Sequence, residues 1–500
     1  MDKNLEYPLI SLNAAKRARN DIEAILRQIR RFAKMSFAEH KAYLQKHPKE
    51  VFFRIPRPDG KGGLLCGAIG WNKVDELTDL ALSLDRGLGR RVGRQRARSA
   101  VTDAFVQRIL GEAREVRYDT AELLLQDTLD TLRKSLIVTE HFLPCVLFTE
   151  YAPTEFRIGP VTFVRRKNFF SDRKQAFKCS IEAATVAHMG HINEAVAQGF
   201  PRERTYSEAQ SRQRIRTLQA QAIKSYRNYP WIAIVKVTDC DKDTSKERAV
   251  RAVEMALHLI RILLGAGPTS ELRHAWSRSN TLRTAHLHAD ADGVIHASVG
   301  MRFLAPISPK DWHEVLMEAS NEVTIFGGAL ESIVDPLEIT PLHQRLLDAI
   351  SWFGDAATDS QITSSTVKYV SAIERLIFGK FEAGRARLFA KRVNSIFEAF
   401  DCNNDGCVYE HALKVYNARS ALVHGEYFPT DDETYEILRI AESLSRMCLI
   451  CSAQLYPMMA RAFDRPDSAK LEEAMRRIHS EGLAWLAEAS GFSKTRRSQT

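Results

Sequence analysis

The feature that most constrains the fold is a run of amphipathic segments in the C-terminal third of the chain. Strand signals disappear after residue 340, and five apolar-periodic segments follow with only short polar breaks. They are PLHQRLLDAISWFGDAA (341–357), SSTVKYVSAIERLIFGKF (364–381), RARLFAKRVNSIFEAF (385–400), YEHALKVYNARSALVHG (409–425) and DETYEILRIAESLSRMCLICSAQLYPMMARAF (432–463). Helical periodicity with short connections predicts an antiparallel helical bundle. We expect this all-α bundle over 341–465, followed by a C-terminal helix and a basic tail over 466–500.

Residues 1–340 combine helical and strand patterns, which predicts an α+β region. A β-hairpin is expected over 281–303, with its turn at Asp292–Gly293. Short runs rich in β-branched and aromatic residues predict strands at CVLFTEY (145–151), at EFRIGPVTFVR (155–165) with a bend at Gly159–Pro160, and at WIAIVKVT (231–238). Helices are expected at about 12–46, 101–138 and 182–227, and in a segment capped by Thr244 or Ser245 and ended by Gly265.

Composition places the chain in the globular class. It has 500 residues, of which 45% are hydrophobic and 27% charged, which is enough for two or three domains. There is no run of eighteen uncharged apolar residues and no apolar stretch behind a basic N-terminus, so we expect a cytoplasmic protein without a membrane partner. The eight cysteines are scattered, as is usual in a reducing compartment. No cofactor is indicated.

Positive charge is concentrated in one window, RGLGRRVGRQRAR, at 86–98 of a chain whose net charge is +9. Such clustering raises the local potential enough to attract polyanions. The candidate contacts to RNA are Arg86, Arg90, Arg91, Arg94, Arg96 and Arg98. The alternative is a solvated basic face without a ligand.

The segment YNARSALVHG at 416–425 contains Arg419 and His424, five positions apart. The bare spacing is not specific, because Arg283 and His288 share it on a predicted strand. The surrounding helical context and the flanking residues therefore carry the inference.

Together with SAIERLIFG (371–379) and ARLFAKRVNSIF (386–397), this segment resembles the Apea-like branch of the HEPN superfamily. The resemblance implies a HEPN-like all-helical domain and a metal-independent ribonuclease of prokaryotic antiviral defence or toxin systems. It also favours a homodimer formed through the C-terminal bundle.

The chemistry of this reaction suits the two residues. RNA carries its own nucleophile, the 2′-hydroxyl, so an enzyme needs to supply only a base, charge stabilisation and geometry. An imidazole exchanges protons near neutral pH, which makes His424 the candidate base or acid. Arg419 has a planar cationic fork that fits two phosphate oxygens. The predicted products are a 2′,3′-cyclic phosphate and a 5′-hydroxyl.

Helix geometry complicates this assignment. Five helical steps place the two side chains about 140° apart around the axis and about 7.5 Å apart along it. A kink at His424–Gly425 or a second copy of the chain would be needed to bring them to one phosphate. The expected supporting residues are Tyr416, Asn417, Ser420 and Glu374, the last of these pairing with Arg419, Arg387 or Arg392.

Three other patterns could be metal-binding sites, but each also has a simpler structural explanation. DCNNDGCVYEHA (401–412) begins like a calcium-binding loop, but Ala412 occupies the position that requires a bidentate glutamate. His286 and His288 are possible metal ligands or an ordinary strand face, and Cys448 and Cys451 are expected to be small core residues. The alternative for the whole bundle is a non-catalytic dimerisation or nucleic-acid-binding module. Residues 1–340 would regulate the bundle or recognise its target.

Overall fold

The computed structural model describes residues 10–490, apart from several short segments. The segments outside the description are 49, 113–114, 198–206, 277–282, 290–294, 302–309, 336–339, 381–383, 404–405, 426–430 and 464–465. The described chain is mainly helical, with a small sheet region followed by a helical C-terminal part, as predicted at this level. It divides into two compact units. Within the described ranges, no helix is both long and apolar enough to cross a membrane.

The first unit comprises residues 1–139, 236–248 and 335–337. Its core is formed by α1, α3 and α6 around the fully buried Ile22, Leu77 and Leu124. The predicted helix over 12–46 is two helices, because Ser36 forms a capping box with Glu39 and starts the second one. The elements are α1 (Leu12–Ala33), α2 (Phe37–Lys46), β1 (Phe53–Pro56), β2 (Gly63–Cys66), α3 (Ala68–Leu84), α4 (Arg86–Arg91), α5 (Arg94–Phe105), the π-helix η1 (Val106–Gly111) and α6 (Tyr118–Lys134).

A five-stranded sheet has the order β4-β5-β6-β3-β7. Strand β3 begins and ends earlier than the predicted strand at 145–151, since α6 ends at Lys134 and the β-branched Ile137 already belongs to β3. Residues 147–151 are not part of a strand. The expected bend at Gly159 is the turn between β4 and β5. The strands are β3 (Ile137–Val146), β4 (Glu155–Ile158), β5 (Val161–Arg165), β6 (Trp231–Cys240) and β7 (Arg273–His274).

The β4–β5 turn packs backbone against backbone on α13 (Ser320–Val334). Gly159 has a φ of +52°, and a Cβ at this position would lie 2.7 Å from the carbonyl oxygen of Gly327. Glycine is therefore required at 159 both by the turn and by the close approach. Helix α13 in turn packs against two helices of the C-terminal part, α14 and α18.

Two predictions about the middle of the chain need correction. The helical region at 182–227 is two helices, and α10 begins at Lys242, because the Asp241 carboxylate accepts hydrogen bonds from the backbone N–H groups of Asp243 and Thr244. Gly265, with a φ of +90°, ends α10 as predicted. The elements are α7 (Arg166–Asp172), α8 (Lys174–Ala197), α9 (Glu208–Tyr226), α10 (Lys242–Leu264), α11 (Ala266–Thr269) and α12 (Trp312–Glu318).

The predicted hairpin consists of β8 (Arg283–Ala289) and β9 (Ile295–Met301), which pair antiparallel from Arg283↔Met301 to Ala289↔Ile295. Its predicted turn at Asp292–Gly293 lies outside the described residues. The hairpin confirms that Arg283 lies on a strand.

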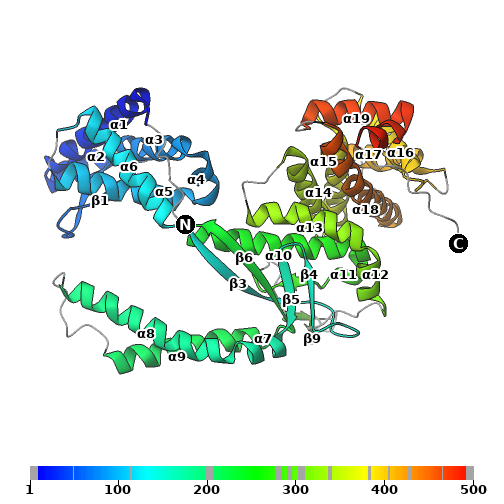
Figure 1. Ribbon diagram of the computed structural model, residues 1–500, viewed down its shortest axis with the longest axis horizontal. Helices are drawn as coiled ribbons and strands as arrows, with labels where there is room; N and C mark the ends of the chain where they lie inside the picture. The colour runs from blue at the N-terminus through cyan, green and yellow to red at the C-terminus, as the bar shows by residue number, and fades with distance from the viewer. Residues whose placement is uncertain are drawn as a thin grey trace. The chain divides into compact units, whose positions relative to one another are not determined.

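All five predicted C-terminal segments are helices (Figure 1, yellow-green to red). Contacts join α14 to α15, α15 to α18, and α16 to α17. Helix α18 also holds the end of α10, since Arg446 Nε donates to the carbonyl oxygen of Ile262 at 2.5 Å and Glu442 accepts from the N–H of Ala266 at 2.8 Å. The helices are α14 (Pro341–Ala357), α15 (Ile362–Ile377), α16 (Arg385–Ala399), α17 (Val408–His424), α18 (Asp431–Ala462), α19 (Ser468–Glu481) and α20 (Ala484–Ala489).

Candidate functional site

Helix α17 buries one face and exposes its last turn. Val408, Ala412 and Val415 are buried along this face, and Arg419 lies eleven residues after Val408, about three helical turns further on. The side chain of Arg419 is accordingly only 26% exposed. His424 is the final residue of the helix and is exposed. Arg419 is therefore not a solvated rim residue, whereas His424 faces solvent.

The carboxylate of Glu374 is the centre of the site. It is 13% exposed, and its Oε2 lies 3.6 Å from Arg419 Nη2. Its Oε1 lies 3.5 Å from Arg385 Nη1 and accepts a 3.4 Å hydrogen bond from the Tyr416 hydroxyl. Burial, followed by the charge of Glu374, raises the pKa of Tyr416. One acid thus joins helices α15, α16 and α17.

The partners of Glu374 agree only partly with the sequence predictions. Arg419 was among the expected partners, but Arg385 takes the place predicted for Arg387 or Arg392. Arg392 instead pairs with Glu472 at 2.5 Å in the interior. Arg387 is an exposed residue of α16.

The guanidinium of Arg419 is held in place mainly by charge. Its distance to Glu374 exceeds hydrogen-bond length, and its Nε is buried without a hydrogen-bond partner. Its central carbon lies 5.9 Å from the centroid of the Tyr416 ring. Glu374 therefore leaves the terminal N–H groups of Arg419 without a direct hydrogen bond, whereas the Nε is too buried to reach a ligand.

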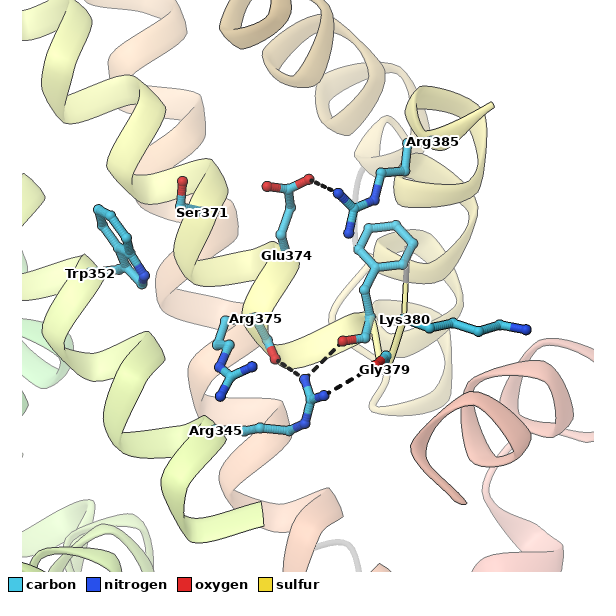
Figure 2. Close-up of a pocket in the computed structure, with 9 residues that line it drawn as sticks. Arg345, Trp352, Ser371, Glu374, Arg375, Gly379, Lys380 and Arg385 are labelled. Carbon is cyan, nitrogen blue, oxygen red and sulfur yellow. Dashed lines mark hydrogen bonds and ion pairs between the residues drawn. The ribbon is translucent and has the colours of Figure 1, made fainter. Parts of the chain in front are cut away.

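A pocket of about 400 Å³ lies beside Glu374. Figure 2 shows Trp352 and Ser371 on one side, Arg385 and Lys380 on the other, and Glu374 and Arg375 between them. Arg345 forms part of the wall and donates to the carbonyl oxygens of Arg375 and Phe378, at 3.0 and 2.8 Å. The described lining thus contains Arg345, Arg375, Lys380 and Arg385 but a single carboxylate. This excess of positive charge favours a phosphate-bearing ligand.

The structure brings Arg419, Glu374 and Tyr416 together, but it does not add the other predicted residues to this group. Asn417 and His424 are exposed and Ser420 is half-buried. Within the described ranges, none of these three side chains forms a hydrogen bond or an ion pair. Of the predicted site residues, only Glu374 lines the described pocket wall, and Arg419, Tyr416 and His424 do not.

The arginine window forms α4 and α5, and much of its charge is matched. Arg94 pairs with Asp79 at 2.9 Å. Arg98 pairs with Asp75 at 2.6 Å, and Arg91 lies 4.0 Å from Asp239. Arg96 is near the Asp103 carboxylate, whose pKa is raised by burial and lowered by this arginine. Arg86 and Arg90 are exposed, and the proposed contact of this window with RNA stays a prediction.

The remaining patterns give mixed outcomes. Cys448 and Cys451 are buried in α18, as predicted, and burial raises the pKa of both thiols. Part of the calcium-like loop, at 404–405, lies outside the described residues, and so do the side chains of His286 and His288. Among the residues that are described, no group of three or more histidines, cysteines or acids is arranged to hold a metal ion.

Sequence reasoning missed a buried basic cluster around a second cavity of about 90 Å³. His258 Nδ1 lies 3.0 Å from Arg261 Nη1, and both side chains are buried. Burial, with a smaller effect of Arg261, lowers the pKa of His274 to about 4, and the pKa of His258 is also lowered. The available signal was a histidine and an arginine three positions apart in the apolar segment MALHLIRILL.

Known proteins do not supply an identity for these sites. No protein-family model matches the chain, and no curated protein or solved structure matches it significantly. The function must therefore be inferred from the residues and distances of the chain itself.

Proposed function

We propose that the C-terminal helices form a HEPN-like domain that acts as a metal-independent endoribonuclease and leaves 2′,3′-cyclic phosphate ends. The observation that carries this proposal is the position of Arg419. Its guanidinium lies 3.6 Å from the carboxylate of Glu374, which lines a cation-rich pocket, and this distance is longer than a hydrogen bond. His424 stands exposed at the end of the same helix.

In this proposal Arg419 stabilises the negative charge that develops on the scissile phosphate. His424 removes the proton of the 2′-hydroxyl or protonates the leaving 5′-oxygen. Tyr416 and Glu374 are positioning residues, because they contact Arg419 rather than the substrate. No cofactor is part of the scheme.

A second copy of the chain completes the site. Arg419 and His424 point about 140° apart on one straight helix, so one chain does not aim both at one phosphate. The last turn of α17 exposes both Val423, at 54%, and His424, so this end of the helix is accessible to a second chain. We propose a twofold homodimer through the C-terminal helices, in which Arg419 of one chain works with His424 of the other.

The biological setting belongs to the same proposal. An intracellular antiviral role, with residues 1–340 recognising the target or restraining the nuclease, follows from the resemblance of the 416–425 segment and its neighbours to Apea-like HEPN domains. The RNA contact of the arginine window belongs here as well. Replacing the exposed Arg86 and Arg90 with alanine would test whether the arginine window contributes to RNA binding.

Cleavage of end-labelled RNA in EDTA tests the reaction. Arg419→Ala and His424→Ala should each reduce the rate by roughly 100-fold or more. Two variants are matched controls and should cleave normally. They are Arg387→Ala, at an exposed position of α16, and His411→Ala, on α17 itself. The product ends should be cyclic phosphates.

Mixing the two inactive variants tests the shared site. A heterodimer contains one site with both residues intact, so random exchange should restore about a quarter of the unmodified activity. Equal cleavage by all variants would remove both residues from the mechanism. Binding of RNA without any cleavage would instead support the non-catalytic module.

A further inference from the structure

We infer that the pocket beside Glu374 binds one unpaired nucleotide of an RNA strand, with the base stacked on Trp352 and a phosphate at the Arg385 and Lys380 side. This inference rests on the proposed function for the identity of its ligand. It goes further by naming the form of RNA that is recognised and the residue that recognises it.

Trp352 is the first observation. It is 42% exposed on α14, whereas the next residue, Phe353, is fully buried. Packing of the helix therefore does not account for the indole at this position. Trp352 lies seven residues after Arg345, which places both on one face of α14 about 10 Å apart along the axis. An exposed aromatic ring in a cationic wall is the usual platform for a nucleic-acid base.

The second observation is the form and charge of the pocket. Its volume of about 400 Å³ lies within the range of small-ligand sites. On α15, Ser371, Glu374 and Arg375 lie three and four positions apart, so they line the same side. Arg375 is held by Asp348 at 2.8 Å, which orients its guanidinium within the wall. A base and its phosphate would therefore meet an aromatic ring on one side of an open pocket and cationic side chains on the other (Figure 2).

The base has to be unpaired. In a duplex both faces of each base are covered by stacking, and a side chain reaches them only where the strand is splayed out. Trp352 is part of the pocket wall, so a stacked base must enter the pocket. The nuclease would thus select single strands, loops or bulges through binding rather than through the cleavage residues.

Binding by the full chain carrying His424→Ala, which is expected to leave RNA uncut, tests the inference. The probe is an eight-nucleotide RNA with one 2-aminopurine, whose fluorescence falls when it stacks, and the comparison is the same RNA in a duplex. Trp352→Ala should weaken binding of the single strand roughly 5- to 100-fold and abolish the quenching. Trp352→Phe should retain most of both, because it keeps an aromatic face.

Trp276→Ala is the matched control, since Trp276 is 47% exposed and does not line this pocket. Thermal unfolding of all variants checks that the fold is retained. Equal binding by Trp352→Ala and Trp276→Ala would overturn the inference, as would an equal loss on duplex RNA. Displacement of the RNA by polyglutamate of the same charge would also overturn it, because the pocket would then recognise charge alone. Retained cleavage by Arg419→Ala would instead refute the proposed reaction and leave this binding result standing.

Discussion

The arginine window of the first unit and the pocket of the C-terminal helices both collect arginines, but they balance the charge differently. In the window, Arg91, Arg94 and Arg98 each have their own aspartate, at 2.6 to 4.0 Å. In the pocket, Arg375 pairs with Asp348 at 2.6 Å and Arg385 lies 3.5 Å from Glu374. Arg345 instead donates to the backbone carbonyl oxygens of Arg375 and Phe378, so its charge is not matched by a carboxylate of the described residues. A cluster of arginines in the sequence therefore does not predict where positive charge exceeds negative charge in the folded chain. The pocket draws its cations from positions 345 to 385, where no local cluster is visible.

The largest expected effect is on the free energy of unfolding and concerns a buried ion pair of the C-terminal helices. Arg392 and Glu472 form a 2.5 Å ion pair with side chains only 5% and 10% exposed. Glu472→Ala would remove the carboxylate that balances the buried Arg392 charge, so the free energy of unfolding should fall by about 3–5 kcal/mol. Urea titration measures this change. Glu473→Ala, which removes a half-exposed partner of Lys470 from the same helix, should cost less than about 1 kcal/mol. Equal losses in the two variants would contradict the distinction between buried and solvated pairs.

The second effect concerns the buried cluster of His258, Arg261 and His274. The pKa of His274 is about 4 in the folded chain, below the value of about 6.5 for an unfolded histidine. Its contribution to stability is therefore complete above pH 6.5 and is lost as the pH falls toward 4. The loss should approach roughly 3 kcal/mol, with a further contribution from His258 in the same direction. Glu254 and Asp355 line the same cavity and moderate the positive charge.

Denaturant unfolding at pH 7 and at pH 4.5 measures this slope. His274→Gln removes the titrating group while keeping a side chain that can accept the 3.3 Å hydrogen bond from the N–H of Trp276. The variant should lose less stability between the two pH values than the unmodified chain does. A steeper loss would assign the acid sensitivity to other groups.

The third prediction compares the two arginine-rich regions directly. In the His424→Ala chain, Lys380→Ala should weaken binding of single-stranded RNA several-fold and reduce the slope of log K against log salt by about 0.7. Arg94→Ala should change the slope less, because Asp79 already neutralises much of that charge. Binding isotherms at several salt concentrations give both slopes. A larger effect at Arg94 would reverse the ranking and favour the window as the RNA contact.

The smallest effect concerns the end of α17. Gly425 has a φ of +70°, and a Cβ added there would meet no atom within 4 Å, so Gly425→Ala costs only backbone strain, about 1 kcal/mol. The strain should fray the turn that carries His424 and lower cleavage with little global unfolding. Gly190→Ala in α8, where φ is helical and space is open, should be neutral or slightly stabilising. Comparing cleavage and thermal unfolding separates the two outcomes.

Helical periodicity predicted the C-terminal helices, because each one buries a regular stripe and the breaks between them are short. The helix boundaries that were predicted wrongly depend on single side chains. Asp241, rather than Thr244 or Ser245, caps α10, since its carboxylate reaches the first free N–H groups. Ser36 divides the first predicted helix in the same way. Several polar residues near the start of a helix can act as its N-cap, and the sequence alone does not show which of them does.

The candidate site was predictable only in part. The pattern around 416–425 indicated Arg419 and Tyr416, and Arg419 was one of the partners expected for Glu374. The hydrogen bond from Tyr416 to Glu374 was not predicted. The choice of Arg385 over Arg387 depends on how α16 is rotated against α15, which sequence spacing does not determine. The exposure of Trp352 could not be predicted either. A tryptophan in an amphipathic helix looks like a core residue until its exposure is known.

The contact between Gly159 and Gly327 has a mechanical consequence. Backbone meets backbone there, so no rotamer change can absorb a displacement of the β4–β5 turn. Any shift of the turn toward α13 must move that helix as a body, and α13 rests on α14, the helix that presents Trp352. Movement of the β4–β5 turn would therefore be transmitted through α13 to the helix that carries Trp352.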